Sequence, residues 1–332
     1  MAELVAMTAG TSENAEIWVL ADDRAGNVAQ CLGVAEALGV PFVVKTLRYD
    51  RLARPPNLLR GAGLTGVTAE SRAVLAAPWP RLVIAAGRRT APVARWIRRQ
   101  CGAKLVQIMD PGFPGRGDFD LIVSPAHDRP GAGGNVLEVL GAPHRVTPER
   151  LAAEAEKWNP AFSALPRPWV AVIVGGATKN RPFPVEMAET LGRNVARLAG
   201  GMGGSVLLTT SRRTGAAQEA ALARGLPEPR WLHLFSQGGD NPYFGFLALA
   251  DAVVVTGDSV SMCCEACASA APVFIWAPEG WAAPKHARLH AQLYQAGLAR
   301  PLEGAASLEG WERPRLNAAE EVARAIRERL LP

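Results

Sequence analysis

The sequence predicts an α/β protein with two doubly wound parallel-sheet domains that face a cleft. The first observation is length, because 332 residues exceed the roughly 250–300 residues beyond which one hydrophobic core tends to split. The second is pattern, since short apolar runs typical of buried strands alternate with segments of helical periodicity in both halves. The third is residues 159–168, a proline-rich stretch without periodicity that we interpret as the hinge.

The first half, residues 1–158, is predicted to form an N-terminal Rossmann-like domain. Apolar side chains at helical spacing precede Gly39, a residue type that commonly closes a helix. Thr147 before Pro148 marks a later helix start, with threonine as the cap and proline in the first turn. The predicted strands are 17–20, 41–47, 82–86, 105–109 and 121–123, and the predicted helices are 27–38, 90–100 and 147–158.

The second half repeats the scheme, and residues 169–315 are predicted to form a C-terminal Rossmann-like domain. A strand, polar turn, helix and strand follow one another between Ala250 and Gln292, which is typical of a βαβ unit. Residues 316–332 carry a last, amphipathic helix. The predicted strands are 169–174, 206–210, 231–235, 252–255 and 273–276, and the predicted helices include 185–198, 216–224 and 318–331.

Composition argues against nucleic acid as a partner. Apolar residues make up 48% and aromatic residues 6% of the chain, with 33 Gly and 26 Pro, which suits a soluble, loop-rich α/β protein. The net charge of +5 is spread along the chain, whereas duplex-binding proteins concentrate positive charge on one face. Anionic small molecules, or peripheral contact with a membrane surface, remain open as partners.

Sequence signals for export, membrane spanning and metal binding are weak. The N-terminal residues lack the basic and apolar regions of a signal peptide, and no run approaches the roughly 18 apolar residues of a membrane span. We therefore expect a cytoplasmic protein, with a membrane-peripheral location as the alternative. Cys263, Cys264 and Cys267 lack the second ligand pair that a zinc site needs, so we interpret them as buried structural thiols and expect no metal.

Polar loops follow several predicted strands, at the sheet edge where open α/β sheets bind ligands. Asp22 and Asp23 follow the first strand, although a helix-capping role for this loop is an equal alternative. Gly175-Gly176-Ala177-Thr178-Lys179 opens the second half, where paired glycines let backbone amides approach a phosphate and Lys179 adds charge. Ser211 and Arg212 follow the next strand and supply a hydroxyl and a guanidinium for phosphate oxygens.

The fourth loop is Thr256-Gly257-Asp258-Ser259, with a helix behind it. Ser261 and Glu265 lie four residues apart and therefore share one helix face. A carboxylate in that place can accept hydrogen bonds from two vicinal hydroxyls, as a ribose offers them. Lys285 and His286 follow the next strand and could complete an anion site. For each loop the plain structural interpretation, a turn or a solvated helix face, stays as the alternative.

Several common motifs are absent or misplaced. The chain has no GxxxxGK[ST] phosphate loop, no Gly-x-Ser-x-Gly elbow, and no tyrosine followed four residues later by lysine. Residues 61–66 fit GxGxxG, but they follow a proline-rich turn instead of a strand, so we interpret them as a loop. These absences count against a nucleotide triphosphatase, an α/β-hydrolase and a short-chain epimerase or reductase.

Taken together, these segments resemble the bacterial branch of the mitochondrial-fission Elm family over nearly the whole chain. The resemblance is carried by residues 20–27, 175–180, 210–214 and 257–262 with Glu265. The pattern from Ala250 to Gly297 is also similar to the donor-binding half of GT-B glycosyltransferases, in particular those that use UDP-N-acetylglucosamine. The Elm family has been labelled a nucleoside-diphosphate-sugar epimerase, and its plant members are linked to recruiting a dynamin-related protein to mitochondria.

The resemblance implies roles for particular residues. As in GT-B enzymes, Glu265 would hold the donor ribose, and Gly175, Gly176 and Thr178 would face the diphosphate. Lys179, Ser259 and Lys285 would stabilise the leaving diphosphate without a metal. The C-terminal helix would pack back on the first domain.

One departure from the pattern of these transferases concerns the catalytic base. The glycine- and histidine-containing loop of the envelope transferases is replaced by residues 22–27, so Asp22 or Asp23 would have to act instead. The expected function is thus a metal-independent, cofactor-free glycosyltransferase that binds a nucleoside-diphosphate-sugar donor and an unidentified acceptor in the cleft. The alternatives are a non-catalytic scaffold or recruitment factor that retains the fold, in a membrane- or division-related role, and an oxidoreductive epimerase with tightly bound NAD.

Overall fold

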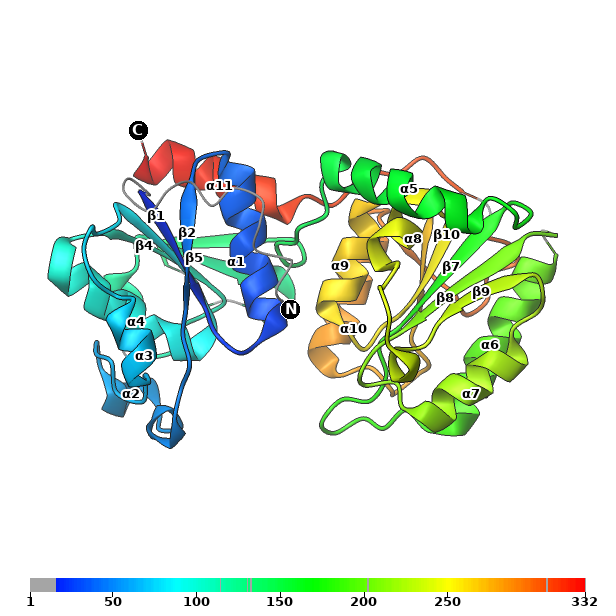
Figure 1. Cartoon of the computed structure of the whole chain (residues 1–332), viewed down its shortest axis with the longest axis horizontal. Coiled ribbons are helices and arrows are strands. Elements are labelled where there is room, and N and C mark those ends of the chain that lie inside the picture. Colours follow the sequence, from blue (N-terminus) through cyan, green and yellow to red (C-terminus); the bar gives the residue numbers. More distant parts are fainter. Residues whose placement is uncertain are drawn as a thin grey trace. The chain divides into compact units, whose positions relative to one another are not determined.

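The computed structural model describes residues 16–113, 115–129, 131, 133–201, 203–308 and 310–331. The chain divides into two compact units (Figure 1). Unit 1 comprises Met1–Arg145 together with Asn317–Pro332, and unit 2 comprises Val146–Leu316. Among the described residues, no helix is both long and apolar enough to cross a bilayer.

Unit 1 is a parallel sheet with helices on both faces. Its strands lie in the order β2-β1-β3-β4-β5-β6, and every pairing is parallel. The strands are β1 (Ile17–Ala21), β2 (Phe42–Thr46), β3 (Leu82–Ala86), β4 (Lys104–Ile108), β5 (Leu121–Pro125) and β6 (Val136–Val139). The helices are α1 (Ala25–Leu38), α2 (Asn57–Arg60), α3 (Ala69–Ala73), α4 (Gly87–Cys101) and α11 (Ala318–Leu330), with short 3-10 turns at Arg51–Ala53, Arg116–Asp118 and Ala126–Asp128.

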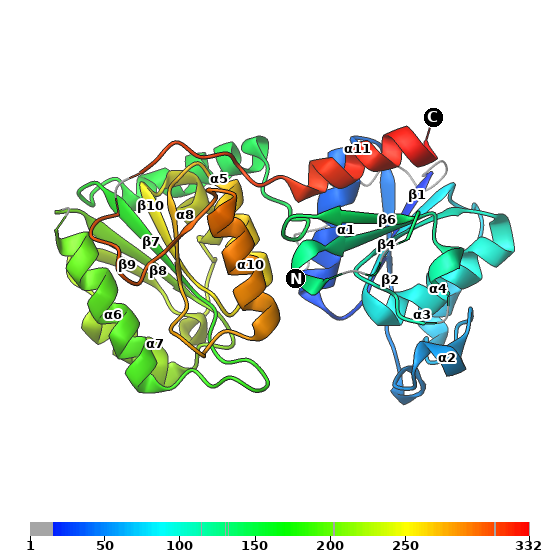
Figure 2. The same cartoon turned by 180° about the vertical axis from the view of Figure 1, so that it is seen from behind.

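The core of unit 1 explains its apolar strands. Strands covered on both faces read as continuous apolar runs, and β1 and β3 are buried at every position. Helices α1 and α11 pack together on one face, and α4 contributes to the core of the other. The last helix of the chain therefore completes the core of unit 1 although it follows all of unit 2 in sequence (Figure 2).

A small change in α11 should show that the core of unit 1 depends on this helix. Ile326 is fully buried in the cluster that joins α11 to α1. We expect Ile326→Val to lower the free energy of unfolding by about 1 kcal/mol, because it removes one buried methyl group. Hydrogen exchange should accelerate in α1 but not in the strands of unit 2. The exposed Glu328→Gln is the matched control, and equal acceleration in both units would contradict the assignment of α11 to unit 1.

Unit 2 has the strand order β12-β11-β10-β7-β8-β9, again fully parallel. Counted along the chain this is the 3-2-1-4-5-6 order of a dinucleotide-binding sheet. The strands are β7 (Trp169–Val174), β8 (Ser205–Thr210), β9 (Arg230–His233), β10 (Ala252–Thr256), β11 (Val273–Trp276) and β12 (Arg300–Pro301). The helices are α5 (Pro148–Phe162), α6 (Val185–Gly200), α7 (Ala216–Gly225), α8 (Tyr243–Leu249), α9 (Val260–Ala268) and α10 (Pro284–Gln295), with a 3-10 turn at Phe235–Gln237.

Helix α5 lies in unit 2, whereas the sequence placed residues 147–158 in the first domain. The aromatic side chains of α5 explain why this helix belongs to unit 2. Phe162 is fully buried and contacts Trp169, Trp231 and Phe246, and Trp158 stacks on Phe162. These aromatic side chains join α5 to β7, β9 and α8. The division between the units thus falls at residues 145 and 146, before the segment 159–168 that we interpreted as the hinge.

Candidate functional site

Three loops of unit 2 meet at the carboxyl edge of its sheet, between β7 and β10. The helices that follow these two neighbouring strands cover opposite faces, with α6 on one and α9 on the other (Figures 1 and 2), which opens a crevice at such an edge. The amide of Gly175 donates to Oγ1 of Thr256 at 2.8 Å. The carbonyl of Gly175 accepts from the hydroxyls of Ser211 and Thr214. The sequence-predicted loops 175–180, 210–214 and 256–259 are therefore directly bonded to one another.

Asp258 is directed into this junction. It is only 4% exposed, accepts from Oγ1 of Thr256 at 2.6 Å and forms an ion pair with Arg213 at 2.5 Å. A Cβ added to Gly175 would lie 2.3 Å from Oδ2 of Asp258. A glycine is therefore required at position 175 because the carboxylate occupies the space of a side chain. Asp258 thus braces the three loops, and its predicted contact with the ligand stays a prediction.

Gly176 lets the same loop turn. Its φ of 121° is a conformation that glycine adopts without strain, and a Cβ there would lie 2.3 Å from the carbonyl oxygen of Arg213. Beyond it, Thr178 and Arg181 exchange backbone hydrogen bonds, so residues 178–181 form a tight turn. Lys179 is exposed on this turn. The predicted phosphate-facing loop thus presents a half-buried threonine and an exposed lysine.

Arg213, which the sequence passed over in favour of Arg212, is the arginine that joins these loops, and a ligand contact of Arg212 stays a prediction. Besides pairing with Asp258, Arg213 donates to the carbonyls of Gly176 and Ala177. Arg212 is exposed. Two consecutive residues of a turn point in different directions, and the sequence holds no signal that selects between them.

Helix α9 begins with the predicted cap. The hydroxyl of Ser259 accepts from the amide of Met262 at 3.4 Å, so it caps the helix that starts at the end of β10. Ser261 is half-buried in the first turn. Because a helix start presents unbonded amides and positive dipole charge, an anion is stabilised there.

Glu265 lies on the same helix and has a specific partner. The hydroxyl of Tyr243 donates to Oε2 of Glu265 at 2.5 Å, and this bond holds one of the two carboxylate oxygens in place. Burial raises the pKa of Glu265, while the Tyr243 hydrogen bond and the charge of Arg150 lower it to a smaller extent. Burial also raises the pKa of Tyr243 well above its usual value. A half-buried carboxylate with one oxygen held in place is suited to receive two hydroxyl groups.

Tyr243 connects Glu265 to the edge of the sheet. Oδ1 of Asn241 accepts from the Tyr243 amide at 3.0 Å and from Oγ1 of Thr209, in β8, at 3.1 Å. The start of α8 is thereby tied to the carboxyl end of β8. Arg150 of α5 lies with its guanidinium 3.6 Å from the ring centre of Phe244. Sequence reasoning missed Tyr243, Asn241 and Arg150, because none of them lies within a recognisable motif.

Lys285 and His286 occupy the first turn of α10, after β11. Lys285 is exposed and His286 is half-buried. Further along α10, the ring of His290 lies against Gly257, where an added Cβ would come within 2.4 Å of it. Among the described residues, no group of three or more His, Cys, Asp or Glu side chains could hold a metal ion.

The cysteines of α9 are packed in the interior. Cys263, Cys264 and Cys267 are fully buried. Burial raises the pKa of Cys263 well above its usual value and that of Cys267 to about 12. The thiols of Cys263 and Cys267 are therefore protonated at neutral pH, and all three buried cysteines pack as small apolar side chains.

The two predicted catalytic aspartates lie in unit 1, between the carboxyl ends of β1 and β3. Asp22 is buried and accepts from the Arg24 amide at 3.0 Å and from Nδ2 of Asn27 at 3.1 Å. Burial raises the pKa of Asp22, and this outweighs the two hydrogen bonds. Asp23 is exposed and forms an ion pair with Arg89 of α4 at 2.7 Å. Asp22 therefore has the environment of a proton acceptor, and Asp23 that of a surface ion pair.

The raised pKa of Asp22 has a testable consequence for stability. Because the folded state binds the proton more tightly than the unfolded state, the contribution of Asp22 to stability is complete below its unfolded pKa near 3.8 and is lost as pH rises through the folded value. We expect Asp22→Asn to stabilise the protein at about pH 7 and to lose this advantage towards about pH 4. Urea unfolding of the variant and of the unsubstituted chain at both pH values measures this difference in stability. A variant that is destabilised equally at both would show that the hydrogen bonds outweigh desolvation.

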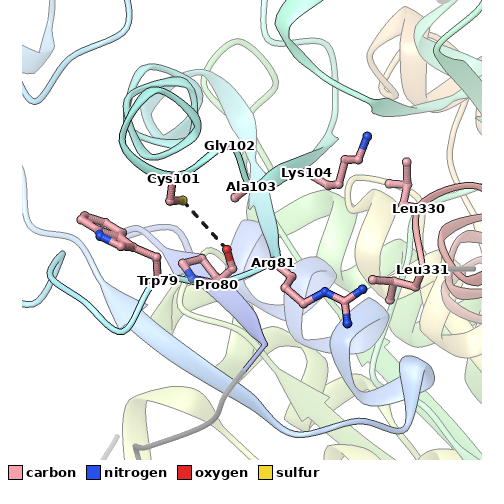
Figure 3. A pocket seen from close by; sticks show the side chains of 9 residues that line it. All are labelled: Trp79, Pro80, Arg81, Cys101, Gly102, Ala103, Lys104, Leu330 and Leu331. Atoms are coloured by element: carbon pink, nitrogen blue, oxygen red, sulfur yellow. Dashed lines mark hydrogen bonds between the residues drawn. The ribbon is translucent and has the colours of Figure 1, made fainter.

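A cavity of about 430 Å³ lies elsewhere in unit 1 (Figure 3). Arg81 and Lys104, at the starts of β3 and β4, line it together with Trp79, Cys101 and Leu330. It is therefore at the amino edge of the sheet, opposite Asp22. Its two cations are already paired, Arg81 with Glu16 and Lys104 with Asp120, and it is not part of the candidate site.

A family model described as Mitochondrial fission ELM1 matches residues 25–330 of the chain. The protein belongs to the mitochondrial fission Elm1 family. This confirms the resemblance inferred from the strand-end loops, since the match spans both units.

Two relatives are similar to this protein over most of the chain. The uncharacterized protein RP120 of Rickettsia prowazekii (strain Madrid E) is 29% identical over 349 residues, covering 94% of this chain and 97% of the relative. Mitochondrial fission protein ELM1 of Arabidopsis thaliana is 29% identical over 296 residues, covering 81% of this chain and 68% of the relative.

Solved structures show the fold of this Elm1-family protein. UDP-GlcNAc 2-epimerase from Neisseria meningitidis, bound to UDP-GlcNAc, superposes with a TM-score of 0.51 at 13% identity, covering 95% of this chain and 99% of that one. The enzyme from Methanocaldococcus jannaschii, in complex with UDP-GlcNAc and UDP, gives a TM-score of 0.50 at 12% identity, covering 94% and 99%. The two parallel, doubly wound sheets are thus those of a GT-B-like fold, as predicted.

Proposed function

We propose that unit 2 of this Elm1-family protein binds a nucleoside-diphosphate-sugar at the carboxyl edge of its sheet, and that the protein is a metal-independent glycosyltransferase. The observation that carries the proposal is the junction of three loops beside the start of α9, with Glu265 one to two turns along that helix. Backbone amides, a helix start and a carboxylate at this spacing complement a diphosphate joined to a ribose.

Each part of the donor has a matching group. The amides around Gly175 and Gly176 and the first turn of α9 at Ser259 are assigned to the diphosphate. Glu265 is assigned to the two ribose hydroxyls. The exposed ammonium of Lys179 is assigned to the charge that develops on the leaving diphosphate, with Lys285 and His286 at the start of α10 in the same role. Ser211 and Asp258 keep the loops in place.

The proposed reaction transfers the sugar to an acceptor hydroxyl. The acceptor oxygen attacks the anomeric carbon of the sugar, the bond from that carbon to the diphosphate oxygen breaks, and the nucleoside diphosphate leaves with the bonding electrons. A carboxylate takes the proton of the acceptor hydroxyl. Asp22 is assigned this role ahead of Asp23, because burial raises its pKa and a stronger base removes the proton more readily.

Binding can be tested before transfer. The probes are UDP, UDP-GlcNAc, GDP-mannose, dTDP-glucose and NAD, each titrated against the full chain by calorimetry and by thermal shift. A UDP- or other nucleotide-sugar should raise the melting temperature, because a ligand at a hundred times its Kd stabilises the folded state by about 2.7 kcal/mol. UDP-GlcNAc is the first choice, since the solved structures of similar fold contain it.

The outcomes separate the alternatives. Binding of a nucleotide-sugar, followed by EDTA-resistant release of the nucleoside diphosphate in the presence of candidate acceptors, supports the transferase. Tight binding of NAD alone would favour the oxidoreductive epimerase. If no nucleotide binds, the proposal is wrong, and a scaffold that keeps the fold for recruitment becomes the better description.

A further inference from the structure

Residues 47–66 form a lobe that leaves the sheet of unit 1 after β2 and returns before α3. Both views show this lobe, with α2 in it, projecting from the body of unit 1 (Figures 1 and 2). Its two ends are joined by the isolated bridge between Tyr49 and Val67. The lobe is not needed to complete the sheet, because β2 is already paired with β1.

The inner side of the lobe is firmly attached to the rest of unit 1. Asn57 is buried and donates through Nδ2 to the carbonyls of Arg88 and Pro111, both at 3.0 Å. The bond to Arg88 has a local cause: the carbonyl of residue 88 would normally accept from residue 92, and Pro92 has no N–H. Arg60 is buried and donates to the carbonyl of Arg89. These bonds fix the orientation of α2.

The outer side of the lobe is apolar. Leu52 and Leu58 are each 62% exposed, and Leu59 is 76% exposed. Phe113, two residues beyond the carbonyl of Pro111 that Asn57 holds, is 84% exposed. These four include the most exposed large apolar side chains among the described residues. Because the inner side is anchored, they are held outwards in a fixed arrangement.

Arginines surround these apolar side chains. Residues 47–66 contain four arginines and a single acidic residue, Asp50. Arg51 and Arg54 are exposed on the lobe, and Arg88 reaches it by donating to the carbonyl of Pro55 at 3.4 Å. Arg51, Arg54 and Arg88 take part in no ion pair among the described residues. Apolar side chains held outwards in this way, beside arginines that have no ion-pair partner among the described residues, complement a bilayer interface that carries anionic headgroups.

We propose that the 47–66 lobe, with Phe113, docks unit 1 on an anionic lipid surface. The leucines and Phe113 enter the boundary between headgroups and acyl chains, and the three arginines stay among the headgroup phosphates. The occupant is a lipid surface because residues 47–66 carry four arginines and a single carboxylate, Asp50, whereas a protein partner of comparable area would need acidic groups placed opposite each arginine. This proposal is independent of nucleotide-sugar binding, whose groups lie in unit 2.

The experiment is co-sedimentation of the full chain with vesicles. One set contains phosphatidylcholine alone, and the other contains phosphatidylcholine mixed with phosphatidylglycerol. We expect binding to the mixed vesicles at low salt and its loss at high salt, because the Debye length falls from about 10 Å at 0.1 M to about 3 Å at 1 M. Leu58→Ser combined with Leu59→Ser should weaken binding about tenfold or more.

Two further variants complete the test. Arg51→Gln combined with Arg54→Gln should reduce binding to the mixed vesicles roughly thirtyfold. Val40→Ser alters a valine that is 43% exposed outside the lobe and should bind like the unsubstituted chain. All substituted side chains are exposed, so melting temperatures should agree. The proposal is overturned if the chain stays in the supernatant with mixed vesicles at low salt, if neutral vesicles bind it equally, or if the two leucine substitutions change nothing.

Discussion

Substituting Gly175 by alanine is expected to destabilise unit 2 by about 3 kcal/mol, within the range seen when one partner of a buried ion pair is lost. The new Cβ would lie 2.3 Å from Oδ2 of Asp258. That carboxylate cannot move freely, because Thr256 and Arg213 both hold it. Either the carboxylate leaves its partners or the strand end shifts, and both outcomes separate the loops that the Gly175 amide and carbonyl join. Chemical denaturation measures the loss.

A second glycine provides the control for the first. Gly200 ends α6, its added Cβ would meet nothing within 4 Å, and its φ is not in the left-handed region. Gly200→Ala should therefore be neutral or stabilise the protein by about 0.5 kcal/mol. Adding Asp258→Ala to Gly175→Ala should restore part of the stability, because the obstructing oxygen is gone. If the two substitutions are additive instead, the clash with Asp258 is not the cause.

Much of the fold follows from the sequence because buried parallel strands leave a clear pattern. Strands such as β7 and β10 are apolar at nearly every position, and the polar residues begin where the strand ends. Since the carboxyl ends of parallel strands share one edge, loops distant in sequence were expected to converge there. The bond between Gly175 and Thr256 joins two such loops. The family assignment followed from the same strand-end residues.

The directions of side chains and the partners of helices were not predictable in this way. Nothing in the order Arg212-Arg213 indicates which arginine turns towards Asp258, because that depends on the backbone turn of residues 211–214, which Ser211 and Thr214 close. An amphipathic helix such as α5 shows that it has an apolar face, but the aromatic side chains that receive it come from β9 and α8. The hydrogen bond between Tyr243 and Glu265 joins residues 22 positions apart, and no local sequence pattern predicts it.

The proposed donor site makes its strongest prediction at Glu265. Glu265→Gln should weaken binding of UDP-GlcNAc, or of whichever nucleotide-sugar binds, by about tenfold to a hundredfold, because a hydrogen bond to a charged group contributes about 1.5–3 kcal/mol. Calorimetry measures the change. Tyr243→Phe is the matched control: it removes the hydroxyl that holds Oε2 but keeps the carboxylate, so its effect should be smaller. Equal affinity in Glu265→Gln and the unsubstituted chain would remove Glu265 from the ribose site.

The pH dependence distinguishes a ribose-binding carboxylate from one that only supports the fold. Because burial raises the pKa of Glu265 above its usual 4.5, the stability that this group contributes without ligand is complete below that value and is lost as pH rises through the folded pKa. Nucleotide-sugar affinity should change in the opposite direction, since two ribose hydroxyls donate only to the ionised form. Affinity should therefore increase with pH above the usual glutamate pKa in the unsubstituted chain, and this increase should be absent in Glu265→Gln. A carboxylate that merely anchors Tyr243 would give the stability trend without the affinity trend.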